Sequence, residues 1–194
     1  WSEYYRKHDE SSLQLRETLA LLNVSEKFGD LHAAIVAYLT ERPKNREPWM
    51  YEALAMAIEL NKGKPEEIKT ALNYAADLAQ RTHNPNHLVS VADKMMLKGF
   101  HERIGPLLDE AIEKLPHRAE PLMMSINLAQ KTKDPKRMAD SIDRLLSLGW
   151  PGNDEYMRRE SRVQAERLAK TLREEGETAE AQKLLDSLPA AEAR

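Results

Sequence analysis

Prolines recur along this chain at a nearly constant interval, and the interval restricts the folds open to it. Pro48, Pro85 and Pro121 are separated by 37 and 36 residues. Each opens an apolar stretch, and proline is tolerated in the first turn of a helix or just past its end. Gly63 and Gly99, which fall at the ends of such stretches, are also 36 residues apart. The recurrence predicts a series of similar units, each a pair of helices.

The composition favours helix throughout the chain. It holds 26 Leu and 23 Ala against 7 Ile and 5 Val. Leucine and alanine favour helix, whereas β-branched residues prefer strands. We therefore expect an all-α chain whose short connections make neighbouring helices antiparallel. The expected helices span 10–27, 30–41, 47–61, 65–80, 86–98, 101–114, 119–132, 135–148, 153–175 and 178–187.

The second helix of each pair repeats with the same period as the first. These helices begin near Pro65, His101 and Pro135, at steps of 36 and 34 residues. One helical hairpin cannot bury its apolar face alone, so successive hairpins must stack. The sequence predicts a helical-repeat domain over 10–189, with an aromatic segment at 1–9 and a tail at 190–194. The Gly105-Pro106 pair should distort the start of the sixth helix.

The unit 85–118 combines large, small and turn residues at set positions: the large apolar residues Leu88, Val91 and Leu108, the small residues Ala92 and Ala111, the turn residue Gly99 and the closing Pro116. In this pattern and in its length the unit resembles the tetratricopeptide (TPR) family, and the other hairpins keep parts of the pattern. The resemblance implies a right-handed α-solenoid of about five hairpins that acts as a protein-interaction scaffold. Related solenoids, such as Sel1-like or HEAT-like arrays, stay open as alternatives.

Methionine pairs mark two successive first helices. Met95-Met96 and Met123-Met124 are 28 residues apart, and adjacent residues on a helix cannot both face the core. In TPR-like stacks the first helices line a concave groove, so we expect one member of each pair there; the alternative is that the methionines fill gaps between repeats. Projection of the repeat predicts a partly Met-lined groove and the partner-binding residues Met50, Asn86, Val89, Asp93, Met96, Met124, Leu128 and Lys131.

No residue pattern predicts catalysis, a metal or a cofactor. The chain has no cysteine, its seven glycines are dispersed, and its serines lie in helical patterns rather than in a GxSxG elbow. His83 and His87 flank Pro85, which prevents them from sharing one face of a continuous helix. The sequence thus predicts a non-catalytic protein with no cofactor.

The charge pattern favours a protein or peptide as partner rather than nucleic acid. The net charge is -3 and the pI about 6.1, so no overall basic field exists for phosphates. No run of 18 apolar residues suggests a membrane span. The stretch 153–175 is basic, yet its glutamates form favourable four-residue pairs such as Glu155–Arg159 and Glu166–Lys170. RNA binding through 153–175 stays a weaker alternative.

The start of the chain suggests a domain of a larger protein. It begins with Trp1 and carries neither an initiator Met nor a signal segment, and removal of a presequence is the other explanation. The surface could then contact flanking domains of the same polypeptide. The aromatic Trp1, Tyr4 and Tyr5 also motivate a competing function, a structural spacer or self-association module whose groove is empty or filled by its own N-terminal segment.

Overall fold

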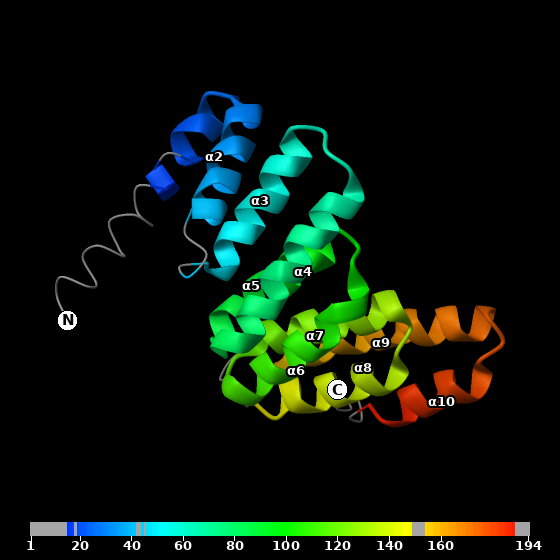
Figure 1. The fold of residues 1–194 in the computed structure, drawn as a ribbon. Helices are drawn as coiled ribbons and strands as arrows, with labels where there is room; N and C mark the ends of the chain where they lie inside the picture. Colours follow the sequence, from blue (N-terminus) through cyan, green and yellow to red (C-terminus); the bar gives the residue numbers. More distant parts are fainter. Residues whose placement is uncertain (1–14, 18, 42–43, 45, 149–153, 189–194) are drawn as a thin grey trace. The chain divides into compact units, whose positions relative to one another are not determined.

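The computed structural model describes residues 15–17, 19–41, 44, 46–148 and 154–188 (Figure 1). These residues form helices joined by short turns, and no strand occurs among them. The expected terminal segments 1–9 and 190–194 lie outside the described residues. Among the helices that are described, none is long and apolar enough to cross a membrane.

The helices begin and end close to their expected positions, which confirms the all-α prediction. Four of them begin at a proline, whose fixed φ suits the first turn. Helical residues at 15–17 and 19–24 come first. They are followed by α2 (Phe28–Glu41), α3 (Pro48–Leu60), α4 (Pro65–Thr82), α5 (Pro85–Leu97), α6 (Ile104–Lys114), α7 (Ala119–Thr132), α8 (Pro135–Leu146), α9 (Asp154–Glu174) and α10 (Thr178–Asp186).

The sixth helix begins later than expected. His101–Arg103 form a 3-10 turn, and α6 starts only at Ile104, just before the Gly105-Pro106 pair. Proline has no backbone N–H to donate and fixes its own φ. The regular α-helix therefore begins next to the proline and not several residues before it. The expected distortion is confirmed.

The chain divides into two compact units, unit 1 (Trp1–Met95) and unit 2 (Met96–Arg194). In unit 1, α3 and α4 pack as a hairpin and α2 packs on α3. Its core contains buried apolar residues of these helices, including Leu31, Ile35, Met50 and Leu72.

Unit 2 has its own core, built by five helices. The α7/α8 and α9/α10 hairpins pack together through α8 and α9, and α6 packs on α7. Their apolar side chains form one cluster, in which Ala129, Met138, Ala165, Leu168 and Ala181 have no exposed surface. The alanines allow the helix backbones to approach closely.

Several turns close with a left-handed residue that is not glycine. Gly99 and Gly176 have positive φ, which glycine adopts without steric cost. Gly29, in contrast, lies inside α2, and Glu26 (φ 55°) takes the left-handed conformation before it. At the α3–α4 turn Lys62 has φ 58°, while Gly63 is needed for space, since a Cβ there would lie 2.4 Å from Ile58 Cγ2.

Candidate functional site

The structure places the eight predicted partner-binding residues in two kinds of environment. Met50, Val89 and Leu128 are buried, so these three side chains belong to the core and not to a surface. The remaining five have solvent-accessible surface. Asn86, Asp93 and Lys131 are exposed, and Met96 and Met124 are half-buried.

On α3 the exposed face does not include Met50, the residue that the sequence predicted to contact a partner. Met56 and Glu59 are exposed on this face. Trp49 and Glu52, which precede them at steps of three and four, are half-buried, and Arg16 lies over the Trp49 ring. Met56 is 41% exposed, whereas Met50 is fully buried. The methionine chosen from the sequence is the one that fills the core.

On α7 of unit 2, too, the exposed face consists mainly of residues other than those predicted. Its exposed face carries Glu120, Met123, Asn127 and Lys131. Met123 is 45% exposed, and Met124 beside it is half-buried. Sequence reasoning missed Met123 and Asn127, although counting in threes and fours back from Lys131 would have found both.

A half-buried carboxylate, that of Glu52, lies on the same face of α3 as Met56. Ser90 Oγ on α5 donates a 2.8 Å hydrogen bond to Glu52 Oε2 on α3, which joins two first helices. Burial raises the pKa of the Glu52 carboxyl above its ordinary 4.5, and the Ser90 bond together with the charges of Lys94 and His87 opposes that rise. Asp93, also nearby, adds to the increase.

In unit 2 a polar pocket of about 310 Å³ lies among α6, α7 and α8, and Arg137 is its central group. The guanidinium binds Asp109 in bidentate fashion, with Nη1–Oδ1 2.7 Å and Nη2–Oδ2 2.9 Å. Nη1 also donates to Ser125 Oγ at 3.2 Å, and the buried Ser141 hydroxyl donates to the same oxygen. The bond to Asp109 raises the pKa of Arg137.

The Arg137 group explains a residue that the sequence left as an irregularity. A Cβ at Gly105 would lie 3.1 Å from Arg137 Nη2, so glycine leaves room for the guanidinium beside α6. Lys136 and Arg144 line the pocket together with Asp134 and Asp140. Three basic and three acidic side chains thus line the pocket, and Arg137 links α6, α7 and α8 through Asp109 and Ser125.

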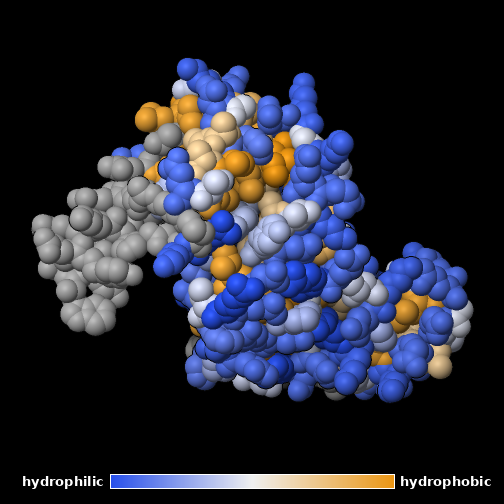
Figure 2. All heavy atoms as spheres, in the orientation of Figure 1, coloured by the Kyte–Doolittle hydropathy of each residue, from blue (hydrophilic) through white to orange (hydrophobic). Residues whose placement is uncertain are grey.

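A second hollow, of about 320 Å³, lies between α3 and α4 of unit 1 and is mainly apolar. Figure 2 shows apolar surface in orange gathered over α3. The rings of Tyr51 and Tyr74 face each other across the helices with centroids 5.4 Å apart. Sequence reasoning did not single out these tyrosines.

The basic stretch of α9 carries internal ion pairs. Arg162 Nε lies 3.0 Å from Glu166 Oε1, and Lys170 Nζ lies 3.8 Å from Glu174 Oε1. Lys170 therefore pairs with the glutamate that follows it, and Glu166 with the arginine that precedes it. These pairs neutralise part of the positive charge through which α9 could bind RNA phosphates.

Comparison with known proteins bears on the fold. No protein-family model matches the chain, and no curated protein matches it in sequence. Its fold is similar to that of a solved structure, PilF from Pseudomonas aeruginosa, a TPR-repeat protein. The TM-score is 0.52 at 16% sequence identity, over 95% of this chain and 79% of PilF. The chain has a TPR-like, all-α helical-repeat fold.

The Arg137 network should stabilise unit 2 more than an exposed ion pair does. Arg137→Met removes the bidentate bond and a donor to a buried hydroxyl, which should lower the free energy of unfolding by about 2 kcal/mol. Arg162→Met, which breaks the exposed pair on α9, should change it by less than about 0.5 kcal/mol. Equilibrium denaturation of both variants measures this, and equal losses would contradict the role given to Arg137.

Glu52 should make stability depend on pH. Because its pKa is raised in the folded chain, its contribution to stability is fully present below pH 4.5, the ordinary value, and is lost as the pH rises through the raised pKa. Glu52→Gln keeps an acceptor for Ser90 without the charge. The variant should therefore be more stable than the wild type at pH 7 and equal to it near pH 4. Unfolding midpoints across this range test the sign, and a variant less stable at pH 7 would contradict it.

Proposed function

We propose that the chain is a non-catalytic protein-binding scaffold that docks a peptide or a partner helix on the exposed faces of its first helices. One observation carries the proposal. Large apolar side chains remain exposed on α3, α5 and α7, namely Met56, Leu97 and Met123. A flexible thioether adapts to varied apolar partners, and helix faces of this kind commonly receive peptides.

In unit 2 the proposed contact residues are on α7. Met123 and the half-buried Met124 would provide apolar contact, and Asn127 and Lys131 would provide polar contact along the same face. Glu120 extends the face toward the start of the helix. The mixture of thioether, amide and charge favours a partner segment of mixed character over a purely acidic or basic one.

In unit 1 the proposed contact residues are on α3 and α5. Met56 supplies the apolar element, and Asn86 and Asp93 supply hydrogen-bonding groups. The Ser90–Glu52 bond holds α5 against α3 and so presets the spacing of the two helices. Met96, the first residue of unit 2, is half-buried near the end of α5 and is retained from the prediction.

The proposal is tested with peptides selected from a random display library on the wild-type chain. Met123→Glu should weaken the selected binders at least about tenfold, because it places a charge where apolar contact is expected. The matched control is Val36→Glu. Val36 is 41% exposed and lies on α2, which follows helical residues 15–24 and so is the second helix of the first pair. This change should leave affinity unaltered. Affinity is read by fluorescence anisotropy.

Two results would contradict the proposal. Binders weakened equally by Met123→Glu and Val36→Glu would show that the first-helix faces have no special role. Failure to select any peptide would favour the structural-spacer alternative.

A further inference from the structure

The apolar hollow between α3 and α4 lies apart from the proposed partner-binding faces and contains an exposed aromatic ring. Tyr51, Leu54 and Ile58 line it from α3, and Ala71 and Tyr74 line it from α4. Tyr74 is 55% exposed, although its ring contacts Tyr51. The Tyr74 ring, beside the buried Tyr51, thus leaves apolar surface in water that an occupant would cover.

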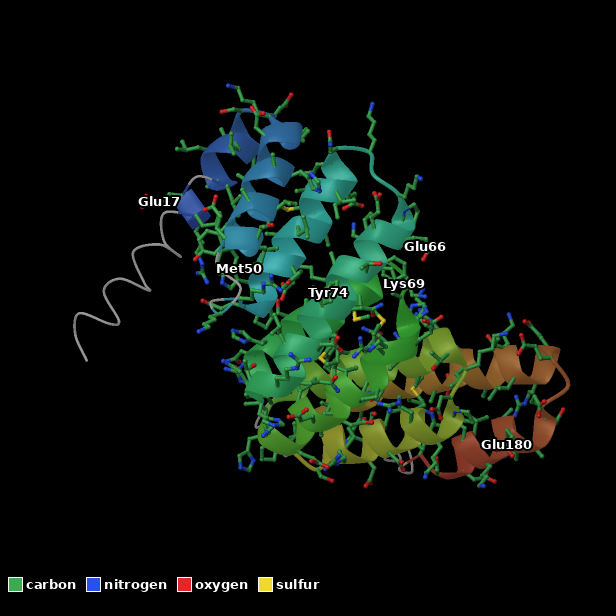
Figure 3. The ribbon with its side chains drawn as sticks, viewed as in Figure 1. Glu17, Met50, Glu66, Lys69, Tyr74 and Glu180 are labelled. Atoms are coloured by element: carbon green, nitrogen blue, oxygen red, sulfur yellow. The ribbon has the colours of Figure 1, made fainter. Side chains whose placement is uncertain are left out.

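One rim of the hollow is acidic. Glu66 and Glu67 lie in the first turn of α4 and line the hollow, about two helical turns before Tyr74 (Figure 3). Glu67 Oε2 accepts a 3.0 Å hydrogen bond from the backbone N–H of Lys64, which fixes its carboxylate at this end. An occupant should therefore pair aromatic side chains with adjacent positive charge.

We propose that the hollow binds the chain's own aromatic segment, through Trp1, Tyr4 and Tyr5 in the hollow and Arg6 and Lys7 at the acidic rim. The segment supplies aromatic side chains at Trp1, Tyr4 and Tyr5, and positive charge at the neighbouring Arg6 and Lys7. Glu3 and Asp9 balance its overall charge, so the pairing depends on the local placement of Arg6 and Lys7 at the rim. Aromatic rings packed against Tyr51 and Tyr74 gain area burial and favourable ring geometry.

The length of chain before the first described helix allows this contact. Nine residues, 6–14, lie between Tyr5 and Leu15. With 5–10 extended and 10–15 in the expected helix 10–27, the connection spans about 25 Å. Arg16 lies over the Trp49 ring of α3, 4.5 Å from its centroid, and Tyr51, which lines the hollow, is two residues further along that helix, so the connection begins beside α3. Tethering also gives the segment an effective concentration of the order of millimolar, well above that of a free peptide. Its own segment is thus favoured over an external one.

The occupied hollow would be a second binding site, independent of the proposed function. A partner peptide with aromatic and basic residues could enter it only by displacing the segment. Docking on the first-helix faces does not require the hollow, so the two proposals can fail separately.

The absence of cysteine allows a direct test on the full chain. Nitroxide labels are attached to Ser2→Cys in the segment and to Arg81→Cys, an exposed position near the end of α4 that does not line the hollow. Pulsed electron resonance should give a narrow distance distribution. Tyr74→Ser should abolish the narrow component, and Tyr74→Phe, which keeps the ring, should retain it. The matched control Tyr156→Ser alters a tyrosine that is 64% exposed on α9, and should leave the narrow component unchanged.

The possible outcomes separate the occupants. A narrow distance that survives tenfold dilution with unlabelled protein, and that needs the Tyr74 ring, supports docking within one chain. A broad distribution that is the same in wild type and Tyr74→Ser overturns the proposal. A narrow distance that disappears on dilution also overturns it, because the occupant is then the segment of a second copy.

Discussion

A helical hairpin has more apolar surface than its two helices can cover, and the rest of this structure follows from that constraint. In unit 2 the apolar cluster takes side chains from five helices, α6 to α10, so no single hairpin accounts for it. Fully buried alanines such as Ala111, Ala129 and Ala181 let the backbones approach closely. The excess of leucine and alanine over β-branched residues therefore serves stacking as well as helix propensity.

Stacking leaves the outward faces of the helices free, and polar contacts between neighbouring helices fix how those faces are presented. Arg137 joins α8 to α6 and α7 through Asp109 and Ser125. Glu52 and Ser90 join α3 to α5. Such contacts specify one relative placement of two helices, which apolar packing alone leaves less defined. The exposed methionines and the exposed Tyr74 ring are then held on ordered helices.

The sequence was sufficient to predict the helices, because prolines and apolar periods act locally. Pro48, Pro65, Pro85 and Pro135 begin helices where expected. The faces of those helices were less predictable, since a helix turns by about 100° per residue and an error of one position moves a side chain from surface to core. Met50 and Leu128 are in the core for this reason, whereas Met56 and Met123 are exposed.

Contacts between distant residues were beyond sequence reasoning. Arg137 and Asp109 are 28 residues apart, and nothing in their local pattern distinguishes them from other charged side chains on helix surfaces. Gly105 attracted notice only as a helix irregularity, yet its lack of a Cβ makes room for the Arg137 guanidinium. The tyrosine pair depends on the packing of α3 against α4, which periodicity alone does not set.

Hydrogen exchange measured residue by residue tests most directly whether the hairpins depend on one another. Leu168 lies fully buried on α9 in the shared cluster, and Leu168→Ala should lower the stability of unit 2 by about 2–5 kcal/mol. Exchange should then accelerate in α7, α8 and α10 together with α9, while the exposed-site change Tyr156→Ala should accelerate none of them. Acceleration confined to α9 would contradict the claim that stacked hairpins share one core.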